Sequence, residues 1–349
     1  MIPYILSLNS YSISYLFFSI RKNNNATRWY KFLSENQKTM YLFSVQNDIY
    51  DQDKEPINLK NIRILLNNYV DQNELILKKI CTSITTRLIQ RFLEEEKLFS
   101  NRALVMTTLK VLFFTQSIAG SPSGIRFVKL TTKEKQCRYD WLSVCYVDSC
   151  RLMQFNKKTV LFYLNLYVHQ ALEMNGNDNY LFDDFSKKYV SFFIQKYPKD
   201  IYKICYDSLS KVINSSDFSD YYIDGDCFDD ILNNRNINTV FGQGQQNSII
   251  KEMIESLIKI KDEKWTRREF LKHIEAKNVF EKRLAIFIVS KNIEELKRGF
   301  LIEINRFASI EFYSEIYSLF KLNSACFDSE ELEMIYEFID NLIMERLSL

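Results

Sequence analysis

The chain has 349 residues, of which 46% are hydrophobic, 15% aromatic and 26% charged, as in a globular protein of one to three domains. Only 7 glycines and 4 prolines occur, which excludes the many tight turns of a β-sandwich or barrel and the glycine-rich loops of nucleotide-binding folds. Two histidines exclude multi-histidine metal centres, and a net charge of +2 gives no overall attraction to nucleic acid or to anionic membranes. We therefore expect a mainly α protein, built as a multi-helix array that is irregular or solenoid-like.

The first segment of the chain allows two interpretations. Residues 2–20 carry no charge, and Arg21 and Lys22 follow directly. Apolar side chains alternate with serines within this segment, which predicts a short β-strand. The length also suits a membrane-associated segment, although the serines lower its hydropathy. We expect the strand and no membrane association.

Helical periodicity dominates the chain from there to residue 214. In residues 71–99 apolar side chains recur three and four positions apart, which predicts a long amphipathic helix. Residues 101–118 predict a second, buried helix that pairs with the first as a hairpin. Residues 119–124 contain Gly, Ser and Pro and predict a loop, and residues 125–130 predict a short strand. Further helices are predicted at 133–152, 157–174, 183–197 and 199–214.

A change of composition predicts a domain boundary in the second half. Residues 215–246 are rich in Asp, Asn and Ser and hold three of the seven glycines. The prediction is an aromatic-rich helical domain at 1–214, an acidic, glycine-containing linker at 215–246, and a helical domain at 247–349. The last domain is predicted to contain helices at 247–260, 266–277, 280–290, 293–307, 310–320 and 329–347.

One arginine–histidine spacing points to ribonuclease chemistry. Arg268 precedes His273 by five positions, and Glu269 places a polar residue directly after the arginine. The motif resembles the R-x(4–6)-H signature of HEPN ribonucleases, all-helical proteins that cleave RNA without a metal. The resemblance implies that Arg268 and His273 are catalytic, activating the ribose 2′-hydroxyl and stabilising the phosphate. The alternative is a basic surface on an amphipathic helix.

The same region is locally basic. Residues 259–283 contain nine positive and five negative side chains, a local charge of +4 that suits contacts with phosphates. The alternative is a solvated helix face. The predicted nucleic-acid contacts are Lys264, Arg267, Arg268, Lys272, Lys277 and Lys282.

Two loop segments and the cysteines bear on metals and cofactors. The aspartates between residues 217 and 230 do not follow the spacing of a calcium-binding loop. Gly242 and Gly244 precede a predicted helix but lack the Gly-Lys-Ser/Thr of a phosphate-binding loop. The seven cysteines include no CxxC pair, which is typical of reduced core residues in a cytoplasmic protein. We expect no metal and no cofactor.

The absence of a catalytic motif context for any Ser or Cys nucleophile favours a role other than catalysis. His169 lies in an apolar helical segment and is predicted to be a hydrogen-bonded core histidine. We expect a non-enzymatic helical scaffold or adaptor subunit of an intracellular multi-protein complex, with a protein partner or self-association. The residue usage is typical of an AT-rich gene, and such genes are frequent in defence loci, so anti-phage defence is a further hypothesis. A HEPN-like ribonuclease and a nucleic-acid-binding accessory protein remain alternatives.

Overall fold

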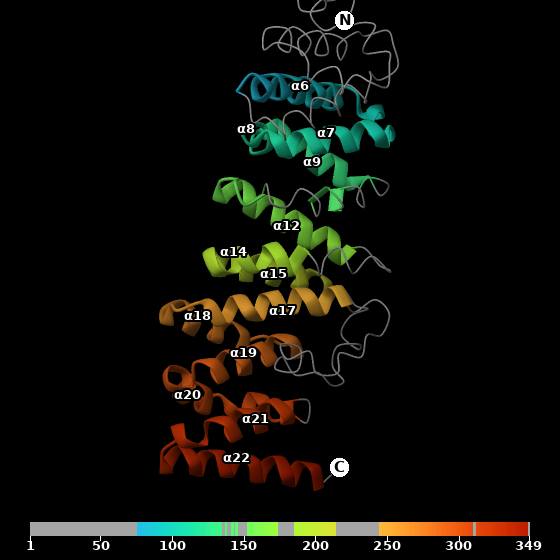
Figure 1. Cartoon of the computed structure of the whole chain (residues 1–349). Helices are drawn as coiled ribbons and strands as arrows, with labels where there is room; N and C mark the ends of the chain where they lie inside the picture. The colour runs from blue at the N-terminus through green and yellow to red at the C-terminus, as the bar shows by residue number, and fades with distance from the viewer. Residues whose placement is uncertain are drawn as a thin grey trace, which may run out of the picture. The chain divides into compact units, whose positions relative to one another are not determined.

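The computed structural model describes residues 75–134, 137, 141–142, 144–145, 152–173, 185–213, 244–309 and 312–347. These residues form 13 α-helices joined by turns and short 3-10 or π-helical segments, and no strand occurs among them (Figure 1). The prediction of a mainly α protein is confirmed for this part of the chain. The strand expected within residues 2–20 lies outside the described residues.

Contacts divide the chain into two compact units, Met1–Tyr163 and Leu164–Leu349. The predicted linker at 215–246 lies almost entirely outside the described residues and stays a prediction. The helices on either side of it are α15 (Pro198–Ile213) and α17 (Gly244–Lys259), which pack along each other within the second unit. None of the helices described in either unit is long and apolar enough to cross a lipid bilayer.

The first unit buries the faces of three helices against one another, since α6 packs on both α7 and α9. Asn101 begins α7, because its side-chain oxygen accepts a hydrogen bond from the backbone N–H of Leu104 at 3.1 Å. Phe92, Phe99 and Phe127 meet in the core with ring centroids 5.0–5.8 Å apart. The elements described here are α6 (Leu75–Glu94), η1 (Glu96–Ser100), α7 (Arg102–Phe114), α8 (Gln116–Ala119) and α9 (Pro122–Lys133).

The strand predicted at 125–130 is wrong, because these residues lie within α9. The hydroxyl of Ser121 accepts a hydrogen bond from the N–H of Gly124 at 3.1 Å, and Pro122 occupies the first helical position. The predicted loop is therefore reduced to the turn between α8 and α9. A side chain at Gly124 would place its Cβ 2.1 Å from the carbonyl oxygen of Ile118, so the glycine permits this close helix approach.

Aromatic side chains fill the core where α12 (Lys157–Glu173) begins. Tyr163 lies within 5.4–5.5 Å of the rings of Trp141 and Phe113, and its hydroxyl donates to the carbonyl of Ala119 at 3.2 Å. All three rings are fully buried. This cluster joins α7 and α12, which both belong to the segment predicted to be an aromatic-rich helical domain.

The second unit stacks successive helices against their neighbours. α15 packs against α14 and α17, α18 packs against α19, and α19 also contacts α20 and α21. The predicted helices of residues 247–347 are all found, with ends that differ by a few residues (Figure 1). Besides α15 and α17, the elements are η2 (Ser186–Val190), α14 (Ser191–Lys196), α18 (Glu263–Ile274), α19 (Val279–Lys291), α20 (Ile293–Ile302), η3 (Ile304–Phe307), α21 (Tyr313–Asn323), η5 (Ser324–Cys326) and α22 (Ser329–Leu347).

Buried ion pairs connect the last helices. Arg283 of α19 lies 2.9 Å from the carboxylate of Glu315 in α21, and Lys297 of α20 lies 2.7 Å from that of Glu331 in α22. Glu331 also forms a reciprocal capping box with Asp328, at 2.9 and 3.0 Å, which fixes the start of α22. Because an unpaired buried charge is costly, these pairs hold α19 to α21 and α20 to α22 in one register.

Candidate functional site

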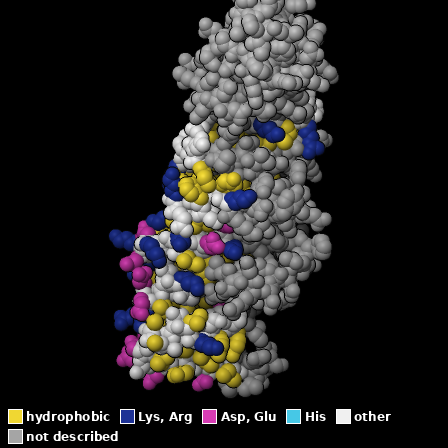
Figure 2. All heavy atoms as spheres, viewed as in Figure 1, with side chains coloured by type: hydrophobic (Ala, Val, Ile, Leu, Met, Phe, Trp, Pro, Cys, Tyr) yellow, Lys and Arg dark blue, Asp and Glu magenta, His cyan; other side chains and the backbone are white. Residues whose placement is uncertain are grey.

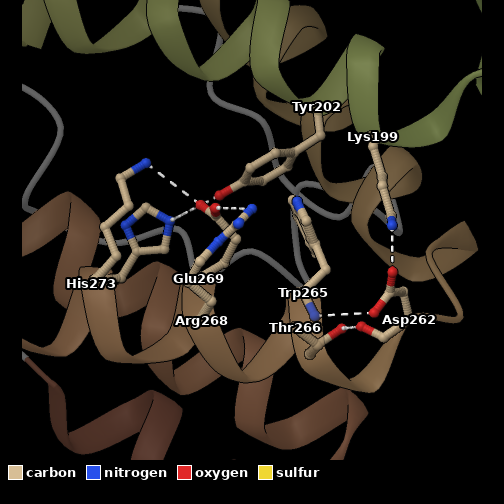
Figure 3. Close-up of polar contacts among 9 residues, drawn as sticks. Lys199, Tyr202, Asp262, Trp265, Thr266, Arg268, Glu269 and His273 are labelled. Atoms are coloured by element: carbon tan, nitrogen blue, oxygen red, sulfur yellow. Dashed lines mark hydrogen bonds and ion pairs between the residues drawn. The ribbon is translucent and has the colours of Figure 1, made fainter.

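The candidate site lies on α18, the helix that carries Arg268 and His273. Asp262 begins this helix, because its carboxylate accepts from the N–H of Trp265 at 3.0 Å (Figure 3). Lys199 of α15 forms an ion pair with the same carboxylate, which ties α18 to α15. The hydrogen bond from Lys199, followed by that from Trp265, holds the pKa of Asp262 below its ordinary value.

His273 is completely buried between three helices. Its Nε2 lies 2.7 Å from the hydroxyl of Tyr202 in α15, and its Nδ1 lies 3.2 Å from the carboxylate of Glu281 in α19. A carboxylate only accepts, so Nδ1 donates to Glu281, and in the neutral ring Nε2 accepts from the tyrosine hydroxyl. Glu269, one turn earlier on α18, places a carboxylate oxygen 3.7 Å from Nε2 (Figure 3). Tyr202, Glu269, His273 and Glu281 are called the His273 cluster below.

The surroundings set the charge states in the His273 cluster. Burial raises the pKa of Tyr202 well above its ordinary value, and the carboxylate of Glu269 adds to this effect. Burial also opposes ionisation of Glu281, but the hydrogen bonds from His273 and Asn278 outweigh it and lower the pKa of Glu281. Tyr206, on the next turn of α15, has its pKa raised by burial to about 12. Glu281 is therefore ionised, and the phenols of Tyr202 and Tyr206 are protonated, near neutral pH.

The order Glu281, His273, Tyr202 is that of a carboxylate, a histidine and a hydroxyl in covalent catalysis. The chemistry requires a reactive hydroxyl that a substrate can reach. Tyr202 is buried, its phenol has a raised pKa, and no atom of His273 reaches the surface. The cluster therefore acts within the core, where it satisfies the polar groups that join α15, α18 and α19.

Arg268 and His273 are not brought together. The Arg268 side chain is 71% exposed, and its guanidinium lies 3.8 Å from the carboxylate of Glu269, whereas His273 points into the core (Figure 3). Positions five apart on a helix are separated by about 140° around its axis, which explains the divergence. This geometry gives no support to a shared catalytic role for the two side chains.

The predicted nucleic-acid contacts divide into two groups. Lys264, Arg267, Arg268 and Lys277 are exposed. Lys272 is committed to Glu269 at 3.3 Å and lies 3.8 Å above the ring of Tyr206.

Lys282, the remaining predicted contact, donates to the carbonyl of Arg306 at 3.0 Å and lies 5.8 Å from the ring centroid of Phe312. The group of four is therefore the more exposed one, although Arg268 also lies 3.8 Å from the carboxylate of Glu269. The basic face that remains is centred on the outward side of α18.

The prediction for His169 is wrong. Its side chain is 39% exposed and pairs with Glu173 of the same helix at 3.1 Å. Asn165, His169 and Glu173 are four positions apart, so they share the solvent-facing side of α12, while Val168 and Leu172 are buried. In the described residues, no three His, Cys, Asp or Glu side chains gather closely enough to hold a metal ion. The aspartates of residues 217–230 lie outside the described residues.

A second candidate surface lies on the last three helices, and the sequence predictions missed it. Figure 2 shows hydrophobic side chains gathered on the visible face of this part of the molecule. Ile302 is 74% exposed, Leu322 is 72% exposed and Tyr336 is 62% exposed. The exposed C-terminal apolar residues are Ile302, Tyr313, Tyr317, Leu322, Met334, Tyr336 and Ile343.

The sequence contained a signal for this surface in α22. Ile335 and Phe338 are buried, whereas Tyr336 and Ile343 lie on another side of the same helix. A helix of a globular protein ordinarily shows one apolar stripe, so a second stripe marks a surface that the described residues leave uncovered. On α21, Tyr313 and Tyr317 stack at a centroid distance of 6.3 Å.

Comparison with protein-family models, with curated proteins and with solved structures found no match to this chain.

Proposed function

We propose that this protein is a non-enzymatic helical scaffold that binds a protein partner through its last three helices. The observation that carries the proposal is that these helices hold most of the large apolar side chains that are exposed in the described residues. Among the described residues, ten large apolar side chains are exposed, and three of these, Phe192, Ile258 and Leu271, lie elsewhere. The other seven are the exposed C-terminal apolar residues.

The composition of this surface supports protein binding. Single exposed apolar residues are normal on any protein, but the stacked tyrosines of α21 and the two exposed apolar residues that share one side of α22 mark an interaction surface. Three of the seven are tyrosines, which are enriched where proteins bind one another because the ring is apolar and the hydroxyl stays hydrated. Membership of a larger complex is a prediction from this role. A place in anti-phage defence is a separate hypothesis that rests on the residue usage of the sequence.

The geometry of α18 supports the non-enzymatic part of the proposal. His273 has both ring nitrogens committed inside the core and no exposed atom. Burial of this histidine favours a structural role over a catalytic one. RNA cleavage in the presence of EDTA, abolished by Arg268→Ala, would favour the ribonuclease alternative instead.

Nucleic-acid binding is a second candidate, favoured by the exposed cations of α18. Lys264, Arg267 and Arg268 lie within one turn of each other and point outward. Contacts of this kind weaken steeply with salt, since they release counterions from the phosphates. Binding of RNA or DNA that falls with salt and is lost in Arg267→Glu/Arg268→Glu would support this candidate.

Recovery of the tagged full-length protein from its native host tests the main proposal. The wild type is compared with the triple variant Tyr317→Ser/Tyr336→Ser/Ile343→Ser and with a control, Phe192→Ser/Leu271→Ser, which changes exposed apolar residues outside the last three helices. We expect a stoichiometric protein partner with the wild type and the control, and about tenfold less of it with the triple variant. Recovery of the wild type alone would overturn the proposal.

A further inference from the structure

The outer side of α22 presents an apolar stripe of regular spacing. Leu332, Tyr336, Ile339 and Ile343 follow one another at intervals of four, three and four residues, so they lie along one side of the helix. Tyr336 and Ile343 are exposed, and Leu332 and Ile339 are half-buried. These four residues are called the outer stripe of α22. It extends over about three helical turns, which is the length that a packed partner helix covers.

Acidic side chains border the outer stripe. The segment 329–343 contains five carboxylates and no lysine or arginine. Glu331 is buried against Lys297, which leaves four exposed: Glu330, Glu333, Glu337 and Asp340. At about 100° per residue, these four lie beside the outer stripe, on the side away from the buried face of α22. The stripe therefore runs between the core of the unit and a negatively charged face.

The charge distribution selects among possible occupants of the outer stripe. A second copy of α22 would bring one acidic face against another, which opposes association. The basic face of α18 in a second copy has the opposite charge, but Leu271 is its only exposed large apolar residue in the described part of the helix. Of these two helices, neither combines positive charge with an exposed apolar stripe in the described residues.

We infer that the outer stripe of α22 binds a basic amphipathic helix of a protein partner. The apolar side of that helix packs on Tyr336 and Ile343, and its lysines or arginines face Glu333, Glu337 and Asp340. The inference rests on the proposed scaffold function and adds the chemistry of the partner. Burial of the two exposed apolar side chains supplies affinity, while the carboxylates select for positive charge and speed association.

Three fluorescent peptides of about five helical turns test the inference with the full-length protein. The first carries leucines along one helical side and lysines on the other. The second keeps the leucines and replaces every lysine with glutamate. The third has the composition of the first in a scrambled order that removes the apolar side. Fluorescence anisotropy measures binding at low and high salt.

We expect the lysine peptide to bind about tenfold more tightly than either control peptide, and less tightly as salt rises. The variants Tyr336→Ser/Ile343→Ser and Glu333→Gln/Glu337→Gln/Asp340→Asn should each weaken this binding about tenfold, and the second should also reduce its salt dependence. The matched control Asp207→Asn/Glu263→Gln/Glu275→Gln removes three exposed carboxylates, one on α15, one at the start of α18 and one directly after its end, and should leave binding unchanged.

Equal binding of the three peptides, or binding that α22 variants leave unchanged, would overturn the inference. A dimer in sedimentation experiments that Tyr336→Ser/Ile343→Ser dissociates would also overturn it, since a second copy would then occupy the stripe. Failure of the proposed function is a different result, because no stoichiometric partner would be recovered from the host. A recovered partner combined with no preference for the lysine peptide overturns this inference alone.

Discussion

α18 and α22 are amphipathic helices of the same compact unit, but they depart from the usual pattern in opposite ways. α18 has polar groups on its buried side, and α22 has apolar groups on its exposed side. α18 buries a histidine and the carboxylate of Glu269 among apolar residues, and its outer face is basic. α22 buries Ile335 and Phe338 in the ordinary way, but its outer side exposes Tyr336 and Ile343 beside acidic residues.

The two helices differ in whether these side chains have partners within the chain. The polar groups inside α18 have partners within the chain, since Tyr202 and Glu281 take both nitrogens of His273. The apolar side chains on the exposed side of α22 leave much of their surface in contact with the solvent. A satisfied buried network stabilises the fold, whereas an exposed apolar stripe is stabilised only by association.

The largest expected effect comes from removing the centre of the buried network. His273→Leu leaves the hydroxyl of Tyr202 and the carboxylate of Glu281 without their shared partner, and should lower the free energy of unfolding by about 2–4 kcal/mol. Arg268→Ala, on the exposed face of the same helix, should change it by less than about 0.5 kcal/mol. Urea denaturation of both variants measures the difference. Equal effects would show that the network adds nothing to stability.

A smaller loss is expected from Tyr202→Phe, which removes one hydroxyl and keeps the ring. The Nε2 of His273 then lacks its partner at 2.7 Å, and the free energy of unfolding should fall by about 1–2 kcal/mol. Tyr317→Phe, at an exposed tyrosine of α21, serves as the control and should have no measurable effect. A loss as large for the control would contradict the distinction between the two regions.

The carboxylate of Glu281 should make the stability of the fold depend on pH. The folded-state pKa of Glu281 lies below its ordinary value of 4.5, so the unfolded chain binds more protons in this range. The stabilisation is present above about pH 4.5 and is lost as the pH falls through the folded-state pKa. Glu281→Gln should therefore reduce the slope of unfolding free energy against pH between about 3 and 5. An unchanged slope would contradict the assignment.

The smallest effect on folding is expected on the outer side of α22. Tyr336→Ser and Ile343→Ser should each change the free energy of unfolding by less than about 1 kcal/mol, because Tyr336 is 62% and Ile343 is 48% exposed in the unbound chain. The same changes should remove partner binding. Thermal unfolding of the purified variants separates the two effects, and a large loss of stability would show that these residues belong to the core.

Much of the helical framework could be predicted from the sequence. The helices of residues 247–347 were found close to the predicted positions, because their apolar residues recur with helical periodicity and capping residues precede several of them. The strand predicted at 125–130 failed because a short apolar run fits either a strand or a helix. The capping hydroxyl of Ser121 and the proline after it decided for the helix.

The candidate site was less predictable than the fold. The spacing of Arg268 and His273 was visible in the sequence, but the partners that commit His273 to the core come from α15 and α19, 71 and 8 positions away. His169 lies in an apolar segment yet points to the solvent with Glu173. Composition around a histidine does not determine which side of its helix faces the core.

The sequence by itself determined that this protein is mainly helical, because scarce glycine and proline and a helical apolar period act locally along the chain. Only the tertiary structure decided which side of each helix is buried. α22 offers two apolar stripes, and the stripe that is buried lies on the helix that packs on α20, to which Lys297 joins it through Glu331. A local sequence pattern specifies which residues share a face of a helix, whereas packing against distant segments determines which face is buried.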